Sequence, residues 1–480
     1  MTRKISYNNF SSKKISGGAL HYYNEISRLL ADSEALDKYN IQADSHNIFD
    51  LVNASDKQME CFAEYLSNYD TVVCNSGIYG FIYHYIREKY KADFNIVRDV
   101  QTSSWSGYFL QEWLIQSLSR EGDLSLFPSE FCRQYFISVF PEHITEINSR
   151  VCYPMQASLP EDVVKKNMTD KSKLKIGYIG RISPGKNFGQ VMRVFAKHYK
   201  QTNGNAKFIF AGFPERSAAT IKKIKHDLEM LGINKNDYQY LGDMPYRKIW
   251  NFYSKIDVLL FPSMASVESL GRVIIEAAWA GVPVIAGAYA AAPELIDASN
   301  VVKCKYKFKD FMLNRLFAFG EIDEQDALRV LNSFTNELDA STFSQFQSDT
   351  FYNLLVNSKS INTNCELTQQ VERFIDSLEF KGISKLSKDE TLHQCKELVE
   401  YFKKYHNNSL LNRIRLVHEG IKQYGFKNNP YIEMYMNRLF IPNDRLILGH
   451  ARVFCEFSGF NPTVSVRNEK GYNLCLDMIE

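Results

Sequence analysis

The feature that most constrains the fold is a regular alternation of short apolar runs with longer amphipathic runs between Lys173 and Ser299. Such alternation is typical of strand–helix–strand units in a parallel sheet, where buried strands are continuously apolar. The expected strands are 174–179, 207–211, 238–241, 258–261 and 282–286, and the expected helices are 188–199, 218–231, 246–254 and 272–280. The sequence therefore predicts a doubly wound α/β domain in this part of the chain.

The N-terminal part repeats the alternation less regularly. Strands are expected at 4–7, 71–74, 95–97, 124–127 and 150–153, with helices at 19–30 and 79–90 among those between them. The polar stretch 160–172, rich in Lys, Asp and Asn, has the composition of a linker. We therefore expect two facing Rossmann-like domains, residues 1–165 and 170–340, with a ligand cleft between them.

The remainder of the chain follows a different pattern. After Asp339 helical periodicity dominates, at 342–356, 367–378, 388–405, 410–424 and 431–439. We expect a crossover helix within 341–359 and a mostly helical extension over 360–480. This extension has no chemistry-bearing motif, and it fits an acceptor-docking module, an oligomerisation element or a segment packed back onto the first domain.

Composition excludes several classes of protein. The 57 Lys and Arg residues nearly balance the 55 Asp and Glu residues, so no global field attracts nucleic acid, and a charged ligand needs a local site. The nine scattered cysteines form no Cys-x-x-Cys pair, which favours a reducing compartment over a disulfide framework or zinc site. No signal-peptide pattern follows Met1, and the apolar stretch 273–296 is interrupted by Glu276, Gly281 and Pro283. The predicted location is cytoplasmic.

The first candidate motif is a glycine-bearing turn, from Gly180 to Asn187, between a predicted strand and a predicted helix. Such a turn presents backbone N–H groups and a helix N-terminus to an anion, and Arg181 and Lys186 add two cations. The turn also fits the first seven positions of a nucleotide-triphosphatase P-loop, but Asn187 replaces the Ser or Thr that holds magnesium, and Asp257 begins its strand instead of ending it. The residues favour a diphosphate site, with a plain structural turn as the alternative.

The second candidate motif is a pair of carboxylates, Glu268 and Glu276, separated by seven residues. Glu276 lies within an apolar helical run and needs a partner, because an unpaired buried charge is costly. It could accept hydrogen bonds from the vicinal hydroxyls of a ribose, while the amides of Leu270, Gly271 and Arg272 at the helix start could meet a phosphate. The alternative is a salt bridge from Glu276 to a neighbouring cation.

These motifs, in this order and at this spacing, make residues 175–294 resemble glycosyltransferase family 4, the retaining enzymes of the glycosyltransferase-B fold. The resemblance rests on Gly180-Arg181, Lys186-Asn187, Ala211-Gly212, Leu241-Gly242, the run 257–263, and the pair Glu268 and Glu276. It implies catalytic roles for Arg181 and Lys186, which would hold the donor diphosphate, and for Glu268, which would face the transferred sugar. The implied donor-binding residues are Gly180, Ser269, Leu270, Gly271, Glu276, Leu241 and, in the first domain, Gly17 and Gly18.

The first domain matches the family less fully. Gly17 and Gly18 resemble the glycine loop beside the donor phosphates, with a plain helix-start turn as the alternative. Family members often carry a His in the loop after the strand 95–100, and residues 101–107 contain none. The contact with the acceptor is therefore assigned to Asp99, Gln101 or Trp105. Ser129 resembles the family's strand-end Ser and is expected to be structural.

The resemblance implies a retaining hexosyltransferase that moves a sugar from a nucleoside-diphosphate sugar to a hydroxyl of a glycan, lipid-linked glycan or protein. Surface-polysaccharide assembly at the inner face of the cell membrane is the expected setting. Retention implies front-face attack, with a covalent intermediate on Glu268 as the alternative. We expect no cofactor and no required metal, since the chain has no Asp-x-Asp.

Two other functions compete with this one. A non-catalytic glycosyltransferase-like subunit that stabilises or regulates an active partner would explain the altered loop 101–107. A nicotinamide-dependent oxidoreductase is disfavoured because no G-x-G-x-x-G opens either predicted sheet. No nucleic-acid partner is expected, while peripheral membrane association and homo- or hetero-oligomer formation stay open.

Overall fold

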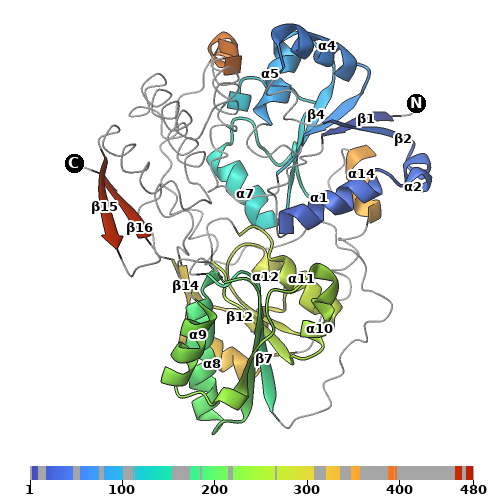
Figure 1. The fold of residues 1–480 in the computed structure, drawn as a ribbon. Helices are drawn as coiled ribbons and strands as arrows, with labels where there is room; N and C mark the ends of the chain where they lie inside the picture. Colours follow the sequence, from blue (N-terminus) through green and yellow to red (C-terminus); the bar gives the residue numbers. More distant parts are fainter. Residues whose placement is uncertain are drawn as a thin grey trace.

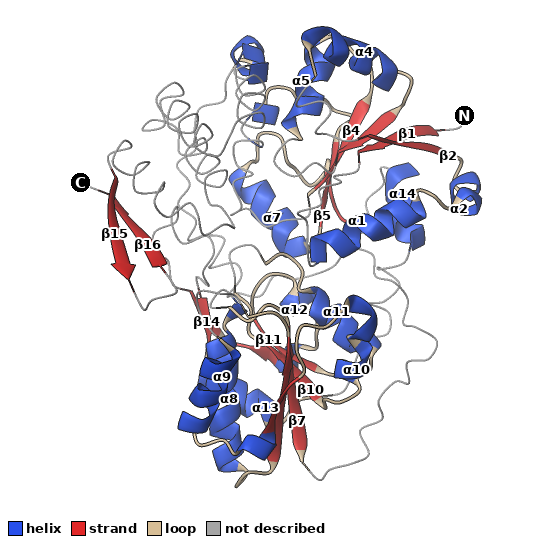
Figure 2. Ribbon diagram, viewed as in Figure 1, coloured by secondary structure: helices blue, strands red, loops and turns tan. Residues whose placement is uncertain are grey.

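The computed structural model of the protein describes residues 3–8, 18–46, 54–74, 80–100, 112, 114–153, 173–183, 186–214, 220–264, 268–306, 320–335, 348–356, 387–393, 395–396, 460–466 and 472–478. Two six-stranded parallel sheets, each with helices on both faces, form two domains that face each other (Figures 1 and 2). The predictions at Gly17, Gln101 and Trp105, and the helices expected at 367–378, 410–424 and 431–439, lie outside the described residues.

The first sheet has the strand order β2-β1-β3-β4-β5-β6. Its strands are β1 (Arg3–Asn8), β2 (Ile41–His46), β3 (Thr71–Cys74), β4 (Asn95–Asp99), β5 (Leu124–Phe127) and β6 (Ser149–Val151). One face packs against α4 (Asp56–Leu66), α5 (Phe81–Lys89) and α7 (Glu130–Val139), and the other against α1 (Gly18–Leu29), with α2 (Ser33–Lys38) beside it. Helix α14 (Ser348–Val356) joins the α1 face, where the Tyr352 hydroxyl donates to the Leu29 carbonyl at 2.6 Å. The chain thus crosses back to the first domain after completing the second.

The second sheet has the order β12-β11-β10-β7-β8-β9. Its strands are β7 (Leu174–Ile179), β8 (Ala206–Ala211), β9 (Tyr238–Tyr240), β10 (Val258–Phe261), β11 (Val284–Gly287) and β12 (Val301–Val302). Helices α8 (Phe188–Gln201), α9 (Ile221–Met230) and α13 (Glu324–Leu331) lie on one side, and α10 (Trp250–Tyr253) and α11 (Arg272–Trp279), followed by α12 (Ala292–Leu295), on the other (Figure 2). Chain order reverses between β7 and β10, and such a switch point is where doubly wound sheets bind ligands.

The sequence-based prediction of two doubly wound domains is confirmed. Strands β3, β5, β7 and β10 coincide with their predicted ranges, because continuous apolar runs mark buried parallel strands. Strand β2 and helix α4 were not predicted, and β2 contains mostly polar residues, as suits an edge strand. A small antiparallel pair, β13 (Cys304–Tyr306) with β14 (Gly320–Ile322), also escaped prediction.

The described residues of the C-terminal extension are 387–393 and 395–396, helical from 388, and an antiparallel pair, β15 (Phe460–Val466) with β16 (Tyr472–Met478). The strand pair was not predicted. Lys388 forms an ion pair with Glu88 of α5, and Cys395 is fully buried in the core that includes α5. This part of the extension therefore packs against the first domain.

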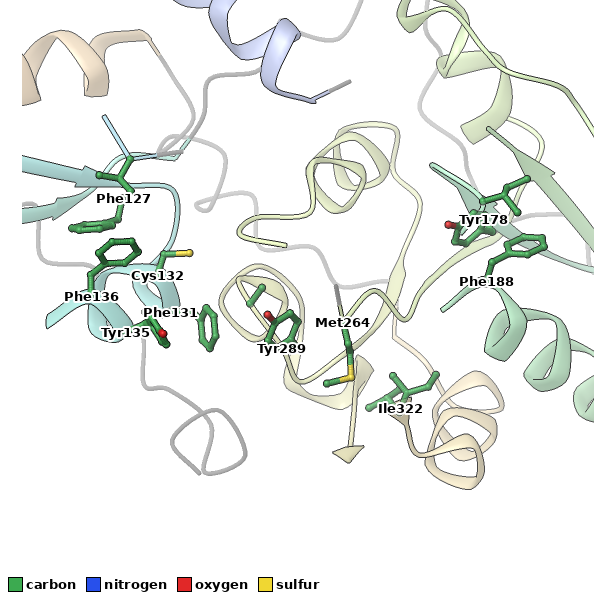
Figure 3. Close-up of a cluster of buried hydrophobic side chains, with 14 of the residues drawn as sticks. Phe127, Phe131, Cys132, Tyr135, Phe136, Tyr178, Phe188, Met264, Tyr289 and Ile322 are labelled. Carbon is green, nitrogen blue, oxygen red and sulfur yellow. The ribbon is translucent and has the colours of Figure 1, made fainter. Parts of the chain in front are cut away.

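Apolar side chains connect the two domains. Phe131 of α7 and Tyr289 of the second domain meet edge to face, with ring centroids 5.4 Å apart (Figure 3). A separate cluster joins Val151 and Tyr153 to Leu270, Ile275 and Ala291. Among the helices that the structure describes, none combines the length and the apolar character needed to cross a membrane.

Candidate functional site

The predicted cations and the first predicted carboxylate converge at the switch point of the second sheet. Arg181 follows β7, Lys186 precedes α8, and Glu268 lies in the loop between β10 and α11. All three stand beyond the carboxyl ends of β7 and β10, which are neighbours in the sheet. The sheet order therefore brings together residues that are more than 80 positions apart in the sequence.

Lys186 and Glu268 form an ion pair at this point. The Lys186 ammonium donates to Glu268 Oε2, and the Ser263 hydroxyl donates to the same oxygen at 2.7 Å. Burial acts to raise the pKa of Glu268, but the charges of Lys186 and Arg181 and these hydrogen bonds outweigh it, so the pKa lies below its usual value. Glu268 is consequently ionised, while Arg181 is exposed beside it.

Glu276 is buried in α11 and has polar partners of its own. The Tyr253 hydroxyl donates to its Oε2 at 3.0 Å, and Arg272 Nε lies 3.7 Å from Oε1. The pKa of Glu276 is raised, because burial outweighs the opposing effects of Arg272 and Tyr253. The sequence left open a salt bridge from Glu276 to a neighbouring cation, and Arg272 is such a cation. A carboxylate accepts about four hydrogen bonds, so these partners leave capacity for a ribose.

A cradle of glycines lines the carboxyl ends of β7, β8 and β9. Gly180, Gly212 and Gly242 all have positive φ, in the region that favours glycine. The Gly180 amide donates to the Ala211 carbonyl at 3.2 Å, and the Gly212 amide donates to the Gly242 carbonyl at 2.8 Å. Leu241, a predicted donor contact, is half-buried beside this cradle and packs on the core of the second domain. The loops that follow β7, β8 and β9 therefore contact one another through their backbones.

Gly212→Ala should destabilise the protein by about 2–4 kcal/mol, because its φ is +126° and a Cβ would lie 1.8 Å from the Gly180 carbonyl oxygen. Gly189→Ala in α8 is the matched control. A Cβ at position 189 would have Arg193 Nη1 as its nearest neighbour, at 3.6 Å, and alanine suits a helix better than glycine. Urea unfolding should show a loss for Gly212→Ala and a small gain for Gly189→Ala. Equal midpoints would contradict the close approach.

The start of α11 completes the predicted donor loop. Gly271 precedes the helix with φ +79°, and a Cβ there would lie 2.9 Å from Phe261. Leu270 is buried between the two domains, and the Ser269 carbonyl accepts from the Ser129 hydroxyl at 2.9 Å. The loop 268–271 is therefore held by both domains.

Two observations argue against a nucleotide-triphosphatase P-loop. Asn187 Nδ2 donates to the carbonyls of Pro262 and Gly320, each at 3.0 Å, so this residue ties loops together. Asp257 accepts from the Lys175 amide at 2.7 Å, at the amino ends of β7 and β10 and thus away from the candidate site. Neither residue stands where a magnesium ligand of that motif would be needed.

On the first domain, fewer predicted residues can be placed. Asp99 ends β4, is buried, and accepts from the Tyr22 hydroxyl of α1 at 2.5 Å. Gly18 begins α1. Ser129 caps α7, since its hydroxyl accepts from the Cys132 amide at 3.2 Å, which is the structural role expected for it.

The sequence analysis did not identify three partners of the predicted residues, namely Ser263 for Glu268, and Tyr253 and Arg272 for Glu276, nor did it single out Glu294, which accepts hydrogen bonds from the first domain. The spacing of Arg272 and Glu276, one helical turn, was available as a signal. No comparable local signal marks Tyr253 or Glu294, whose contacts depend on tertiary packing.

Among the comparisons with known proteins, the family match falls on the second domain. Residues 161–309, less than half of the chain, match the family model described as glycosyl transferases group 1. No curated protein matches the sequence. The narrower assignment to glycosyltransferase family 4 stays a prediction.

Among solved structures, the lipopolysaccharide outer core galactosyltransferase WaaB in its apo form is similar with a TM-score of 0.52 and 17% identity, over 74% of this chain and 98% of that chain. HepE of Anabaena in complex with UDP-glucose gives a TM-score of 0.44 and 16% identity, over 83% and 99%. Sucrose-phosphate synthase of Thermosynechococcus elongatus gives 0.47 and 13%, over 83% and 98%. The likeness to WaaB shows the glycosyltransferase-B fold that the sequence predicted.

Proposed function

We propose that the chain is a retaining glycosyltransferase that moves a sugar from a nucleoside-diphosphate sugar to a hydroxyl acceptor. One observation carries the proposal: Arg181, Lys186 and Glu268 converge at the switch point of the second sheet, beside the start of α11 and its buried Glu276. The match of residues 161–309 to the group 1 model supports the same function.

The chemistry of the site suits a diphosphate leaving group. Cleavage of the bond between the sugar C1 and the phosphate oxygen builds negative charge on the departing phosphate. Arg181, Lys186 and the amides of Leu270 and Gly271 would stabilise that charge more in the transition state than in the substrate. Lys186 would exchange its pairing with Glu268 for the diphosphate, which leaves the carboxylate to face the sugar ring.

In the proposed reaction the C1–phosphate bond breaks and a bond forms from C1 to the acceptor oxygen on the same face. The acceptor hydroxyl loses its proton to the departing phosphate oxygen, so atoms and charge balance without another reactant. Glu268 would stabilise positive charge developing on the ring. Covalent attack by Glu268 is the alternative route, and it needs the same residues.

The donor would bind mainly to the second domain and the acceptor mainly to the first, where Asp99, Gln101 and Trp105 stay the proposed contacts. We propose a glycan, lipid-linked glycan or protein acceptor, and assembly of a surface polysaccharide on the cytoplasmic side of the cell membrane. The proposed donor contacts are Gly17, Gly18, Gly180, Leu241, Ser269, Leu270, Gly271 and Glu276.

Thermal unfolding in the presence of nucleotides tests donor binding. A ligand at 100 times its Kd that binds only the folded state stabilises it by about 2.7 kcal/mol, which is several degrees in Tm for a chain of this size. We expect UDP, GDP or ADP, with the matching nucleotide sugar, to raise Tm, and NAD to leave it unchanged. A rise with NAD alone would contradict the proposal and favour an oxidoreductase.

The second candidate function is a non-catalytic subunit, favoured by the lack of His in residues 101–107. Such a protein would bind the nucleotide sugar and leave it intact. An active transferase deprived of its acceptor releases nucleoside diphosphate slowly by hydrolysis, so hydrolysis separates the two.

A further inference from the structure

We propose that Glu294 is a positioning residue for the donor loop 268–271, which it holds in place by docking the second domain onto the first turn of α7. The inference rests on the proposed function only in naming that loop as the diphosphate contact. The docking itself follows from contacts between the domains.

Glu294, in α12, accepts three hydrogen bonds from the first domain. Its Oε1 accepts from the Phe131 amide at 2.8 Å, and its Oε2 accepts from the Glu130 amide at 2.9 Å and from the Tyr153 hydroxyl at 3.0 Å. The first amides of a helix have no partner within the helix, and the positive end of the helix dipole favours an anion there. A carboxylate of the second domain therefore caps a helix of the first.

The same turn of α7 also binds the donor loop. The Ser129 hydroxyl donates to the Ser269 carbonyl at 2.9 Å, and the Cys132 thiol lies 3.8 Å from that carbonyl. Leu270 packs into the cluster that contains Tyr153, the other Glu294 partner. A displacement of α7 from Glu294 would thus move Ser269, and with it the amides of Leu270 and Gly271.

Apolar side chains pack beside the cap, and its α7 residues Glu130 and Phe131 are buried, while Glu294 itself is half-buried. Phe131 packs against Tyr289 (Figure 3). Tyr289 lies between β11 and Glu294 in the sequence, so this contact is close to the cap. Hydrogen bonds in such surroundings are stronger than in water, and a buried donor left without its acceptor costs about 1–3 kcal/mol. Loss of the Glu294 carboxylate would leave the amides of Glu130 and Phe131 without an acceptor.

The charge of Glu294 gives the docking a pH dependence. Burial raises its pKa to about 7, against the opposing effect of the two α7 amides and Tyr153, with a further rise from Glu130. Glu130 is paired with Arg133 at 2.8 Å, and the Cys132 thiol also faces this region. The α7 amides by themselves favour the anion, but the raised pKa means that docking on balance favours the protonated carboxyl, so docking weakens as pH rises from about 4.5 to 7 and changes little above that range.

Amide hydrogen exchange of the full chain at pH 7, without any ligand, tests the positioning directly. We compare wild type, Glu294→Ala, Glu294→Gln and the surface control Glu229→Ala, which alters an exposed residue of α9. Glu294→Ala should speed exchange at least tenfold in the first turn of α7 and also at residues 268–272. Glu294→Gln, whose amide oxygen still accepts, should restore part of the protection, and Glu229→Ala should match wild type.

Faster exchange in α7 alone, or no change at all, would overturn the inference, because Glu294 would then be a cap without influence on the loop. A second readout uses UDP, GDP and ADP binding by titration calorimetry. For the nucleotide that binds wild type, Glu294→Ala should weaken affinity about tenfold, and an unchanged affinity would overturn the positioning role. If wild type binds no nucleotide while the loop exchange responds as expected, the proposed function fails and the positioning stands.

Discussion

Lys186→Ala should lower donor-dependent nucleotide release by about 100- to 1000-fold, the size of effect seen when one group that stabilises transition-state charge is removed. The Lys186 side chain is mostly buried and is paired with Glu268 in the unliganded protein. Its removal takes away a cation for the diphosphate and leaves an ionised carboxylate where the donor must bind. Release of nucleoside diphosphate, measured with a coupled assay, gives kcat and KM for the donor.

The matched control is Lys197→Ala in α8, the helix that Lys186 precedes. Lys197 pairs with Glu324 near the surface, and exposed pairs of this kind contribute about 0–1 kcal/mol to stability. Its turnover should stay within twofold of wild type. Turnover of Lys186→Ala equal to that of Lys197→Ala would remove Lys186 from the catalytic site.

Glu276→Ala should weaken donor binding by about 10- to 100-fold. A hydrogen bond to a charged group contributes about 1.5–3 kcal/mol, and 1.4 kcal/mol corresponds to a tenfold change in affinity. The fold should survive, because the raised pKa of Glu276 shows that burying its charge is unfavourable, and because the Tyr253 hydroxyl also lies 3.3 Å from the Val273 carbonyl. Titration calorimetry with the nucleoside diphosphate measures this loss of affinity.

Glu276→Gln separates shape from charge, since the amide keeps an acceptor for Tyr253 but offers a ribose fewer acceptor sites. We expect an intermediate affinity. Equal affinity of wild type, Glu276→Gln and Glu276→Ala would show that the carboxylate serves only Arg272 and Tyr253, the structural alternative that the sequence left open.

The sequence predicts the second domain well because its signals are local. Continuous apolar runs define β7 and β10, and the order of a doubly wound sheet then places their carboxyl ends together. Arg181, Lys186 and Glu268 follow those strands closely, so their meeting could be expected before any coordinates. Glu276 could be singled out because a charge within an apolar helix needs a partner.

Other parts of the site depend on packing that no local pattern reveals. Tyr253 reaches Glu276 from α10, and Ser263 shares an oxygen of Glu268 with Lys186. Glu294 contacts amides of α7 that lie more than 160 positions earlier in the chain. Strand β2 is polar at the sheet edge, and an apolar pattern cannot mark a strand that buries little.

Hydrolysis of nucleotide sugars without acceptor tests the central claim most directly. Wild-type protein is incubated with UDP-, GDP- and ADP-sugars, and free nucleoside diphosphate is measured over time beside Lys186→Ala. We expect slow release from at least one donor by wild type and loss of that release in Lys186→Ala. Binding of a nucleotide sugar with no release by wild type, with or without a hydroxyl acceptor, would contradict this expectation and favour the non-catalytic subunit.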